Sequence, residues 1–332
     1  MFMGNFQQFW DELNKEIQSL IDPTTQRVAV KYTVKRDCVV CSSSHNTFLF
    51  DKYGFTYVQC SDCSMIFTDP VLSQKYLDEL YEYSHALEYY ASLMTVEAKK
   101  RRARISSKIA TKIHGNVKTE GGKRKWLDIG CGYGALLRAA GEKGYSLYGI
   151  EPSKDCQKKL QEVNVEVYDD LMSAPFSEGY FDVISLKQVI EHLFDPKEVV
   201  SYAYRLLKPG GVLWIATPNT KGVGMKIMKE HHPSYQRGHI NMFSTVTLRR
   251  MVLEAGFQDV RVTTYYLKTI HLLSYLKRRK DTREDVFKMI DTLPKEGGVK
   301  RFLYYNVVVP TLDAVVKATR NGDYVEVFGR KS

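Results

Sequence analysis

From about residue 124 to the C-terminus, short apolar runs alternate with longer segments of helical periodicity. Each run is short and rich in β-branched and aromatic residues, which predicts a strand. The predicted strands lie at 125–129, 146–150, 164–168, 181–186, 211–216, 258–265 and 323–329. Helices are predicted from Ala135, from Ser153, from Asp195 and over 244–255, where Ser244 is the candidate N-cap. This alternation predicts an α/β fold, in which a mostly parallel sheet is covered by helices on both faces.

The first third of the chain has a different pattern. Residues 5–21 carry apolar residues at helical spacing, and Asp22-Pro23 ends the helix that this spacing predicts. Residues 36–70 contain short, aromatic, strand-like pieces, in a stretch too small to fold without a cross-link such as a metal or a disulfide. From about Ser73 to Ile113 the chain is helical in pattern, first rich in tyrosine and then basic.

Four cysteines stand in that short stretch, at Cys38, Cys41, Cys60 and Cys63. Two Cys-x2-Cys pairs separated by 18 residues are typical of a structural zinc site, in which four thiolates complete the tetrahedron. Iron, or four buried cysteines without metal, are the alternatives. Because the zinc coordination would be complete, we expect it to stabilise the fold and to take no part in catalysis.

These patterns divide the chain into four predicted parts. They are an N-terminal helix and lead-in (1–35), a zinc-binding module (36–70), a helical linker (71–118) and the α/β domain (119–332), with a helical insertion at 267–320. The chain has 332 residues, of which 44% are hydrophobic, enough for a sizeable core. It has no apolar run of 18 residues, and its first residues lack the order of a secretory signal. We therefore expect a cytoplasmic protein.

The net charge of +10 is concentrated in three basic clusters. They are Lys99 to Arg102 with Arg104, Lys123 to Lys125, and Lys277 to Lys280. Such clusters attract nucleic acid, anionic lipid or a phosphorylated substrate, but they are more often solvated helix faces. Charge alone does not decide between these interpretations.

A glycine-rich turn joins the first predicted strand of the α/β domain to its first helix. Glycines at 130, 132 and 134 let the backbone approach a ligand closely. Cys131, between two of them, is better explained as a small residue in a tight bend than as a nucleophile. The next strand ends at Glu151, about 20 residues on, where a carboxylate can accept hydrogen bonds from the two hydroxyls of a ribose.

The ordered set of motifs resembles class I S-adenosylmethionine-dependent methyltransferases over about residues 124–265 and the last strand. The matching segments are Leu-Asp-Ile-Gly-Cys-Gly-Tyr-Gly (127–134), Gly-Ile-Glu-Pro-Ser (149–153), Phe-Asp-Val-Ile (181–184), Ile-Glu-His-Leu-Phe-Asp-Pro (190–196), Leu-Leu-Lys-Pro-Gly-Gly-Val-Leu (206–213) and Phe-Ser-Thr-Val-Thr-Leu (243–248). With the cysteine pairs, the chain is similar to bacterial methyltransferases that carry an N-terminal zinc ribbon. Many of those act in surface-polysaccharide, glycolipid or secondary-metabolite pathways. The resemblance implies a Rossmann-like, seven-stranded methyltransferase sheet.

The resemblance also implies which residues hold S-adenosylmethionine. Asp128, Gly130, Gly132 and Gly134 take the methionine end, Glu151 takes the ribose, and Asp169 or Asp170 contacts the adenine. Lys187 and Gln188 leave the fourth strand where the sulfonium and the acceptor meet. For Gln188 the alternative is a loop residue that is satisfied by backbone groups.

Histidines after the fourth strand are the candidate general bases. His192 is the leading candidate, and His239, in the long loop 218–242, ranks above His231 and His232 because it immediately precedes Phe243-Ser244. For each, a purely structural role is the alternative. The glycines of that loop, Gly222, Gly224 and Gly238, would permit closure over a substrate.

A catalytic metal is not expected beside His192. Ubiquinone-type O-methyltransferases have a Glu-x-x-Glu-His segment here that can hold a divalent metal. In this chain Gln188 replaces the first carboxylate, which leaves Glu191 and His192, a poor ligand set for a hard cation.

The sequence therefore predicts a methyltransferase that acts on a small-molecule acceptor, with a sugar or glycoconjugate intermediate favoured and oxygen or carbon as the acceptor atom. The alternatives are a tRNA or rRNA methyltransferase, and an inactive, zinc-dependent scaffold protein. Contact with nucleic acid is not favoured, because no recognisable RNA-binding module is present. An apolar segment at 300–318, which we expect to be broken near Pro310, is either a lid, a peripheral membrane contact or a packed helix. The oligomeric state is left open.

Overall fold

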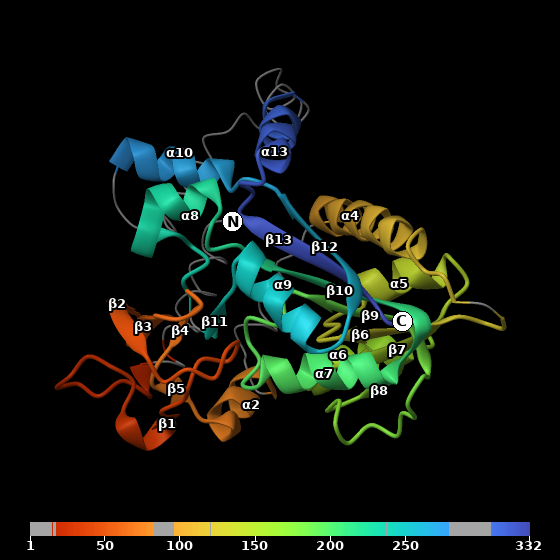
Figure 1. Cartoon of the computed structure of the whole chain (residues 1–332), viewed down its shortest axis with the longest axis horizontal. Coiled ribbons are helices and arrows are strands. Elements are labelled where there is room, and N and C mark those ends of the chain that lie inside the picture. The colour runs from red at the N-terminus through yellow and green to blue at the C-terminus, as the bar shows by residue number, and fades with distance from the viewer. Residues whose placement is uncertain (1–14, 16–17, 83–95, 120, 237, 279–306) are drawn as a thin grey trace.

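A computed structural model of the chain describes residues 15, 18–82, 96–119, 121–236, 238–278 and 307–332. Its main body is a seven-stranded sheet with helices on both faces, and a smaller sheet lies beside one end of it (Figure 1). Most of the predicted helix at 5–21 lies outside the described residues. At its end, Asp22 closes a turn by accepting hydrogen bonds from the backbone N–H groups of Thr24 and Thr25.

The main sheet contains all seven predicted strands. They are β6 (Lys125–Ile129), β7 (Ser146–Ile150), β8 (Glu166–Tyr168), β9 (Phe181–Lys187), β10 (Leu207–Pro218), β12 (Gln258–Tyr265) and β13 (Tyr324–Arg330), in the spatial order β12-β13-β10-β9-β6-β7-β8. In this spatial order, neighbouring strands among β10, β9, β6, β7 and β8 pair in parallel. Strand β13 is antiparallel to both its neighbours, β10 and β12. The prediction of a mostly parallel sheet is confirmed. The carboxyl ends of β6 to β9 lie along one edge, called the carboxyl edge below.

Two helical layers cover the sheet, and alternate residues of each strand face one or the other. Helices α4 (Val96–His114), α5 (Ala135–Gly141) and α6 (Lys154–Gln161) cover one face, whereas α7 (Pro196–Leu206) and α9 (Thr245–Glu254) cover the other. Within β10, Trp214 packs with the first layer and Leu213 and Ile215 pack with the second. This period of two explains why the strands read as continuous apolar runs.

Three of the four predicted helix starts have side-chain caps, and the fourth, at Ala135, follows Gly134. Ser153 accepts a hydrogen bond from the N–H of Cys156 at the start of α6, and Asp195 accepts one from Glu198 at the start of α7. Ser244 forms a capping box with Thr247 at the start of α9. These side chains satisfy backbone donors that a helix cannot satisfy internally, which is why their position in the sequence predicts the helix start.

The insertion at 267–320 contributes α10 (Thr269–Arg278) and α13 (Val309–Ala318), with residues 279–306 outside the described part of the chain. Pro310 lies in the first turn of α13, where a missing backbone N–H costs nothing. The α-helix begins at Val309, and because residues 300–306 lie outside the described part of the chain, the expected break near Pro310 stays a prediction. Two short helices, α8 (Val223–Met228) and η2 (Lys229–His231), lie in the loop after β10.

The cysteine module, residues 36–70, folds as a small sheet. It contains β2 (Asn46–Lys52), β3 (Phe55–Cys60) and β4 (Ile66–Thr68), and it is flanked by η1 (Val30–Tyr32), by the pair β1 (Thr33–Val34) and β5 (Val71–Leu72), and by α2 (Gln74–Glu82). The fourth strand of this sheet is β11 (Asn241–Met242), which comes from the α/β domain and pairs with β4. The two parts thus share one sheet, which the sequence did not predict.

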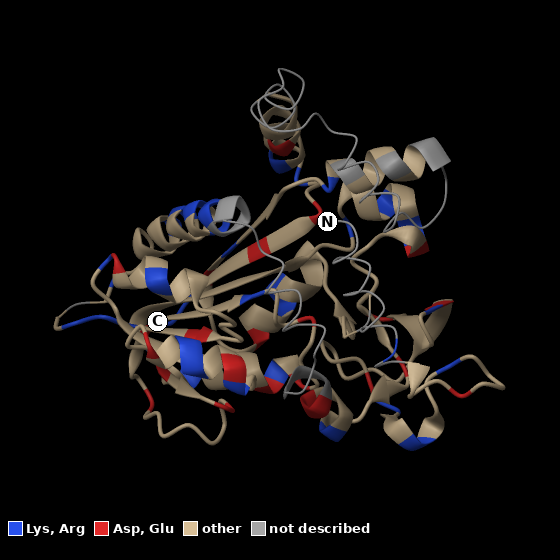
Figure 2. Ribbon diagram, turned by 180° about the vertical axis from the view of Figure 1, so that it is seen from behind, with Lys and Arg blue, Asp and Glu red and all other residues tan. Residues whose placement is uncertain are grey.

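The basic clusters differ in their surroundings. Lys100, Arg101, Arg102 and Arg104 are exposed on α4, whose ribbon carries a run of basic positions in Figure 2. In the second cluster, the Lys125 Nζ lies 3.4 Å from the ring centroid of Tyr180. The side chains of the third cluster lie outside the described residues. Among the described residues, no helix has the length and apolarity needed to span a membrane.

Candidate active site

The glycine turn connects β6 to α5 at the carboxyl edge, and two of its glycines have distinct roles. Gly130 has a φ of 65°, and a Cβ there would lie 2.4 Å from Cγ2 of Val189. The turn after β9 therefore packs directly on the glycine turn. Gly132 has a φ of 51°, but a Cβ there would meet no protein atom within 4 Å. The backbone at Gly132 faces open space, as a cradle for a ligand requires.

Asp128 is buried at the end of β6. Its Oδ1 accepts a hydrogen bond of 2.5 Å from Oγ of Ser185, which in turn accepts one from Nε1 of Trp126. Burial raises the pKa of Asp128 to about 7, against the hydrogen bond from Ser185 and the charge of Lys187, which lower it. A carboxyl group in this state favours a positively charged ligand, because such a ligand would stabilise its ionised form.

Glu151 joins the end of β7 to the glycine turn. Its Oε2 accepts a hydrogen bond of 2.7 Å from the N–H of Gly132, and its Oε1 accepts one of 3.0 Å from the N–H of Ser153. Burial raises its pKa, and these two backbone bonds oppose that shift. Each carboxylate oxygen has a further lone pair, so Glu151 keeps the capacity to accept ribose hydroxyls. The residues present thus fit the cofactor that the motifs imply.

Asp169 and Asp170 follow β8 at the rim of the same edge. Asp169 pairs with Lys154 and accepts a hydrogen bond from Nε2 of Gln157, which also donates to the backbone carbonyl of Glu151. Asp170 accepts a hydrogen bond of 2.8 Å from the N–H of Ser173. Their position beside Glu151 suits the predicted adenine contact, which stays a prediction.

Lys187 and Gln188 lie at the end of β9. Burial lowers the pKa of Lys187, and the neighbouring Asp128 opposes that shift. Gln188 is exposed and has a φ of 57°, and its N–H donates a 2.7 Å hydrogen bond to the carbonyl of Ala216. The structure therefore holds Gln188 by its backbone, as the alternative interpretation expected, and its contact with cofactor or acceptor stays a prediction.

His192 and His239 come together from two different loops. Their ring centroids are 4.6 Å apart with an interplanar angle of 79°, and Glu191 completes a group whose ligand atoms all lie within 4.8 Å of one another. The Nδ1 of His192 lies 2.8 Å from the carbonyl of Gly238, and that of His239 lies 2.8 Å from the carbonyl of Ser234. Because a carbonyl only accepts, both rings donate through Nδ1, which fixes Nε2 as the basic atom.

Burial keeps the imidazole of His192 neutral and makes the carboxyl group of Glu191 hard to ionise. Burial lowers the pKa of His192 to about 4, and its bond to Gly238 opposes the shift. Burial raises the pKa of Glu191 to about 7. One oxygen of Glu191 accepts a 2.9 Å hydrogen bond from Thr217, whereas the other is buried without a hydrogen-bond partner among the described residues.

Three possible metal ligands, and not two, lie together beside His192. The sequence argument considered only the segment 188–192 and missed His239, which gives a set of one carboxylate and two imidazoles. In this structure, however, Nε2 of His239 lies 2.7 Å from the amide nitrogen of Gln236, so that atom already accepts a hydrogen bond. In this arrangement His192 is the candidate proton acceptor, and His239 lies beside it with Nε2 bonded to Gln236.

His231 and His232 do not join this group. His231 lies beside the ring of Tyr275, at 5.6 Å between centroids, and His232 is buried with its Nδ1 accepting from the N–H of Ser234. The sequence ranked His239 above both, and of the three it is His239 that lies beside His192. Its catalytic role stays a prediction. Two glycines of the loop have a packing role, since a Cβ on Gly222 or Gly224 would lie about 2.5 Å from atoms of Asp323. Loop closure stays a prediction.

The four cysteines of the module converge as the spacing predicts. The sulfurs of Cys38 and Cys63 are 3.5 Å apart, those of Cys41 and Cys60 are also 3.5 Å apart, and all four lie within 4.8 Å. The two Cys-x2-Cys segments share one backbone hydrogen bond. The N–H of Ser42 donates to the carbonyl of Cys38, and the N–H of Ser64 donates to the carbonyl of Cys60. Cys131 is buried, away from this cluster, and burial raises its pKa, as expected for a packing residue.

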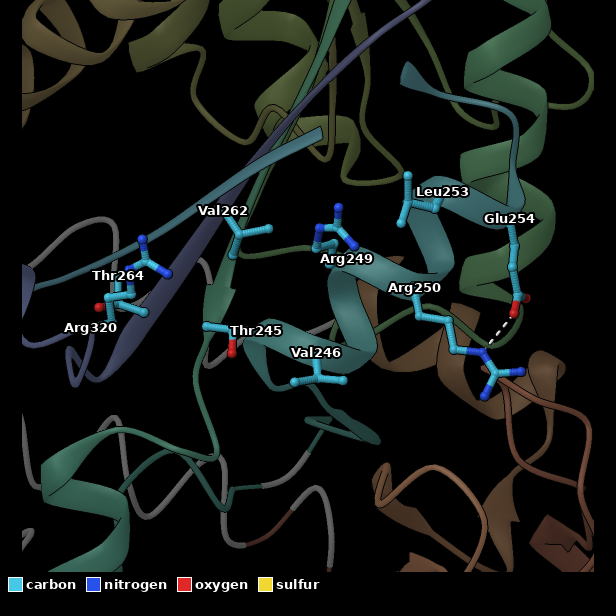
Figure 3. A pocket seen from close by; sticks show the side chains of 9 residues that line it. All are labelled: Thr245, Val246, Arg249, Arg250, Leu253, Glu254, Val262, Thr264 and Arg320. Carbon is cyan, nitrogen blue, oxygen red and sulfur yellow. Dashed lines mark hydrogen bonds and ion pairs between the residues drawn. The ribbon is translucent and has the colours of Figure 1, made fainter. Parts of the chain in front are cut away.

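A cavity of about 610 Å³ lies elsewhere, between α9 and β12 (Figure 3). Its lining includes Val246, Arg249, Leu253 and Arg320, and none of the predicted site residues. Arg250 at its rim pairs with Glu254, as the dashed line in Figure 3 shows. The cofactor residues and the histidine pair therefore do not belong to this cavity.

Sequence reasoning missed three residues that organise the site. Ser185 supports Asp128, Asn241 donates a 2.7 Å hydrogen bond to the carbonyl of Leu193, and Arg36 reaches the same region from the cysteine module. A signal existed only for Ser185, as a polar residue in the middle of an apolar strand. The other two act across pairings of distant segments, for which periodicity carries no information.

Comparison with known proteins agrees with this geometry. Residues 90–262, more than half of the chain, match the family described as "Methyltransferase domain". This chain belongs to that family. It is a methyltransferase of class I, the S-adenosylmethionine-dependent group, as the motifs of the glycine turn and the later strands predicted. The predicted seven-stranded sheet with helices on both faces is confirmed too.

Two curated relatives of the methyltransferase carry the name ubiquinone biosynthesis O-methyltransferase. The protein of Thiobacillus denitrificans is 28% identical over 158 residues, which cover 42% of this chain and 67% of the relative. That of Pseudomonas aeruginosa is 36% identical over 104 residues, which cover 29% of this chain and 45% of the relative. The chain thus spans less than half of the second relative.

Solved structures resemble the methyltransferase more distantly. An S-adenosylmethionine-dependent methyltransferase from Archaeoglobus fulgidus has a TM-score of 0.46 and 20% identity, and the match covers 69% of this chain and 94% of that one. A geranyl diphosphate C-methyltransferase from Streptomyces coelicolor has a TM-score of 0.45 and 15% identity, covering 72% and 83%.

Proposed function

We propose that the protein transfers a methyl group from S-adenosylmethionine to an oxygen or carbon atom of a small molecule, a sugar or glycoconjugate intermediate. The observation that carries this proposal is the contact between the two halves of the site. Val189 packs on Gly130, so the turn that leads to His192 lies against the turn that would hold the cofactor. A proton acceptor and a methyl donor would thus meet at one edge of the sheet.

Residues of the glycine turn and the adjacent strand ends would bind the cofactor. Asp128 would attract the ammonium group of its methionine end, the backbone at Gly132 would lie against it, and Glu151 would accept the ribose hydroxyls. S-adenosylmethionine supplies an electrophilic methyl group on a positively charged sulfur. The protein then has to align the acceptor atom with that methyl group and exclude water.

His192 would act as the general base for a hydroxyl acceptor. Its Nδ1 hydrogen is directed to Gly238, so the acceptor proton would go to Nε2. Burial keeps its imidazole neutral at physiological pH, with a pKa of about 4, so it is in the accepting form. The ring of His239 lies nearly perpendicular to this ring, in a T-shaped contact, and would fix its orientation. A carbon acceptor that carries an acidic hydrogen would use the same base.

The choice of a small-molecule acceptor rests on two kinds of support. The curated relatives are named for O-methylation of a small biosynthetic molecule, which argues for this substrate size. The sugar or glycoconjugate class follows from the cysteine module, which this chain shares in pattern with zinc-ribbon methyltransferases of polysaccharide and glycolipid pathways. The exposed basic positions of α4 would favour an acceptor that carries phosphate.

The four cysteines would hold structural zinc. Four sulfurs at about 2.3 Å from a central zinc stand about 3.8 Å apart in a regular tetrahedron, close to the 3.5 Å that separates the sulfurs within each of two pairs here. The metal would stabilise the small sheet that the cysteine module shares with β11. It would have no open position for a substrate.

A transfer assay with S-adenosylmethionine that carries a labelled methyl group tests the function. The acceptors are nucleotide sugars, glycolipids and RNA, and the enzymes are the wild type and His192→Ala. We expect label in a sugar or glycolipid fraction, with a loss of about 100-fold or more for His192→Ala. Label in RNA would show that the acceptor is a nucleic acid and not a sugar. Full activity of His192→Ala would refute the role of His192 as the base.

A further inference from the structure

Arg36 connects the cysteine module to the catalytic side of the α/β domain. It stands two residues before Cys38, and its guanidinium group donates three hydrogen bonds to that domain. Nη1 donates to the carbonyl of Phe194 at 3.3 Å, and Nη2 donates to the carbonyl of Ile240 at 2.8 Å and to Oδ1 of Asn241 at 3.0 Å. A single side chain thus bridges segments that lie more than 150 residues away in the sequence.

The groups that Arg36 binds belong to the two segments that carry the histidines. Phe194 ends the turn that contains Glu191 and His192, and Ile240 immediately follows His239. The two segments are also tied to each other, because the N–H groups of Ile240 and Asn241 both donate to the carbonyl of Glu191, at 2.9 and 3.0 Å. Arg36 therefore holds both histidine-bearing segments at the point where they meet.

The side chain of Asn241 extends this connection. Its Oδ1 accepts from Arg36, while its Nδ2 donates to the carbonyls of Leu193 at 2.7 Å and Ile190 at 3.3 Å. These carbonyls flank Glu191 and His192 in the sequence. The orientation of the turn that carries the base thus depends on a polar network that begins at Arg36.

A second contact from the cysteine module acts on the same loop. The hydroxyl group of Tyr57, a buried residue of β3, lies 3.2 Å from the carbonyl of Gln236 and 3.3 Å from that of His239. Strand β4 pairs with β11 immediately after Ile240. The loop that carries His239 is therefore fixed on the module at three points, by Arg36, Tyr57 and β4.

The guanidinium group of Arg36 is only partly accessible to solvent, in a position where a charge is costly to desolvate. Its Nε is buried without a hydrogen-bond partner among the described residues. A guanidinium group carries its charge at neutral pH. An apolar side chain would fill the same space at a lower desolvation cost but could not bind three backbone and amide oxygens.

We propose that Arg36 is a positioning residue for His192 and His239, through which the cysteine module sets the geometry of the acceptor side of the active site. This inference rests on the proposed function for its catalytic consequence. The cofactor side, formed by the glycine turn and Glu151, receives no hydrogen bond from Arg36. Loss of Arg36 should therefore affect turnover and leave cofactor binding unchanged.

The test compares three variants of the full-length protein. Arg36→Met removes the donors and keeps much of the volume, and Arg36→Lys restores one charged donor group. Arg27→Met is the matched control, because Arg27 belongs to the same region and forms an exposed ion pair with Asp51 at 2.7 Å. For each protein, kcat, KM for the acceptor, the dissociation constant of S-adenosylmethionine and the metal content are measured.

We expect Arg36→Met to lower kcat by about ten- to a hundred-fold, the value of a charge-assisted hydrogen bond, with cofactor affinity and metal content within about two-fold of the wild type. Arg36→Lys should recover part of kcat, and Arg27→Met should behave as the wild type. An unchanged kcat in Arg36→Met would overturn the proposal. A loss of cofactor affinity as large as the loss of kcat would also overturn the proposal, because it would indicate that the substitution disrupts the whole site.

A second readout does not depend on activity. In protein with isotope-labelled histidine, the NMR signals of the ring hydrogens of His192 and His239 report their surroundings directly. We expect both to shift in Arg36→Met and to stay in place in Arg27→Met. If the wild type transferred no methyl group to any acceptor, the proposed function would fail, while unshifted ring signals would refute the positioning role by themselves.

Discussion

Burial raises the pKa of Asp128 to about 7, so its charge changes within the physiological pH range. A cofactor whose ammonium group lies beside Asp128 should bind the ionised form more tightly, and its affinity should fall as the pH decreases through 7. We predict that the dissociation constant of S-adenosylmethionine increases about ten-fold between pH 8 and pH 6. In Asp128→Asn it should be high and nearly constant over that interval.

Isothermal titration calorimetry at several pH values measures both proteins. The comparison separates Asp128 from other titrating groups, since only the slope that disappears in Asp128→Asn belongs to it. If both proteins had the same pH dependence, the charge of Asp128 would not contribute to cofactor binding. Unchanged affinity in the variant would remove Asp128 from the binding site altogether.

Residue roles were predictable from the sequence where one short segment defines them. Asp128, the glycines of the turn and Glu151 follow predicted strands directly, and the parallel sheet brings these strand ends to one edge. The pairing of His192 with His239 was only partly predictable, because it depends on how the loop 218–242 returns to the sheet. Arg36 was not predictable, since a single arginine near a cysteine carries no signal of its distant partners.

At the scale of elements, hydrophobic periodicity predicted all seven strands of the main sheet and the starts of α6, α7 and α9. These elements have strong local signals, namely apolar runs of fixed length and capping side chains at their first residue. Strand β11 has only two residues, and its pairing with β4 joins segments far apart in the sequence. Such pairing depends on the tertiary structure, and local pattern cannot predict it.

The small sheet of the cysteine module should depend on its metal. We predict that Cys63→Ser lowers the zinc content from about one ion per chain to a small fraction, and lowers the midpoint of thermal unfolding, because a metal that completes a small fold contributes directly to its stability. The matched control is Cys156→Ser. Cys156 is buried in α6 and lies outside the four-cysteine cluster.

Mass spectrometry of bound metals and thermal unfolding measure these two effects. The control should keep its zinc, and its unfolding midpoint should change by less than that of Cys63→Ser. Full zinc content in Cys63→Ser would mean that the four sulfurs do not form the site. Iron in place of zinc would keep the site but change the identity of the metal.

At the scale of the whole molecule, the main sheet and the cysteine module form one structure, joined by β4 and β11 and by Arg36. The residues that we propose for the cofactor belong to the α/β domain, whereas the loop of His239 also contacts the cysteine module. Cofactor binding can therefore be measured without knowing the acceptor.

Binding of S-adenosylmethionine tests this account most directly, with Gly132→Ala and Gly121→Ala as a matched pair. Both glycines have positive φ, and a Cβ on either would meet no protein atom within 4 Å, so the two substitutions impose similar backbone strain. By isothermal titration calorimetry we expect one site per chain in the wild type and in Gly121→Ala, and a loss of about ten-fold or more in affinity for Gly132→Ala. No binding by the folded wild-type protein, or equal affinity in all three proteins, would contradict the account.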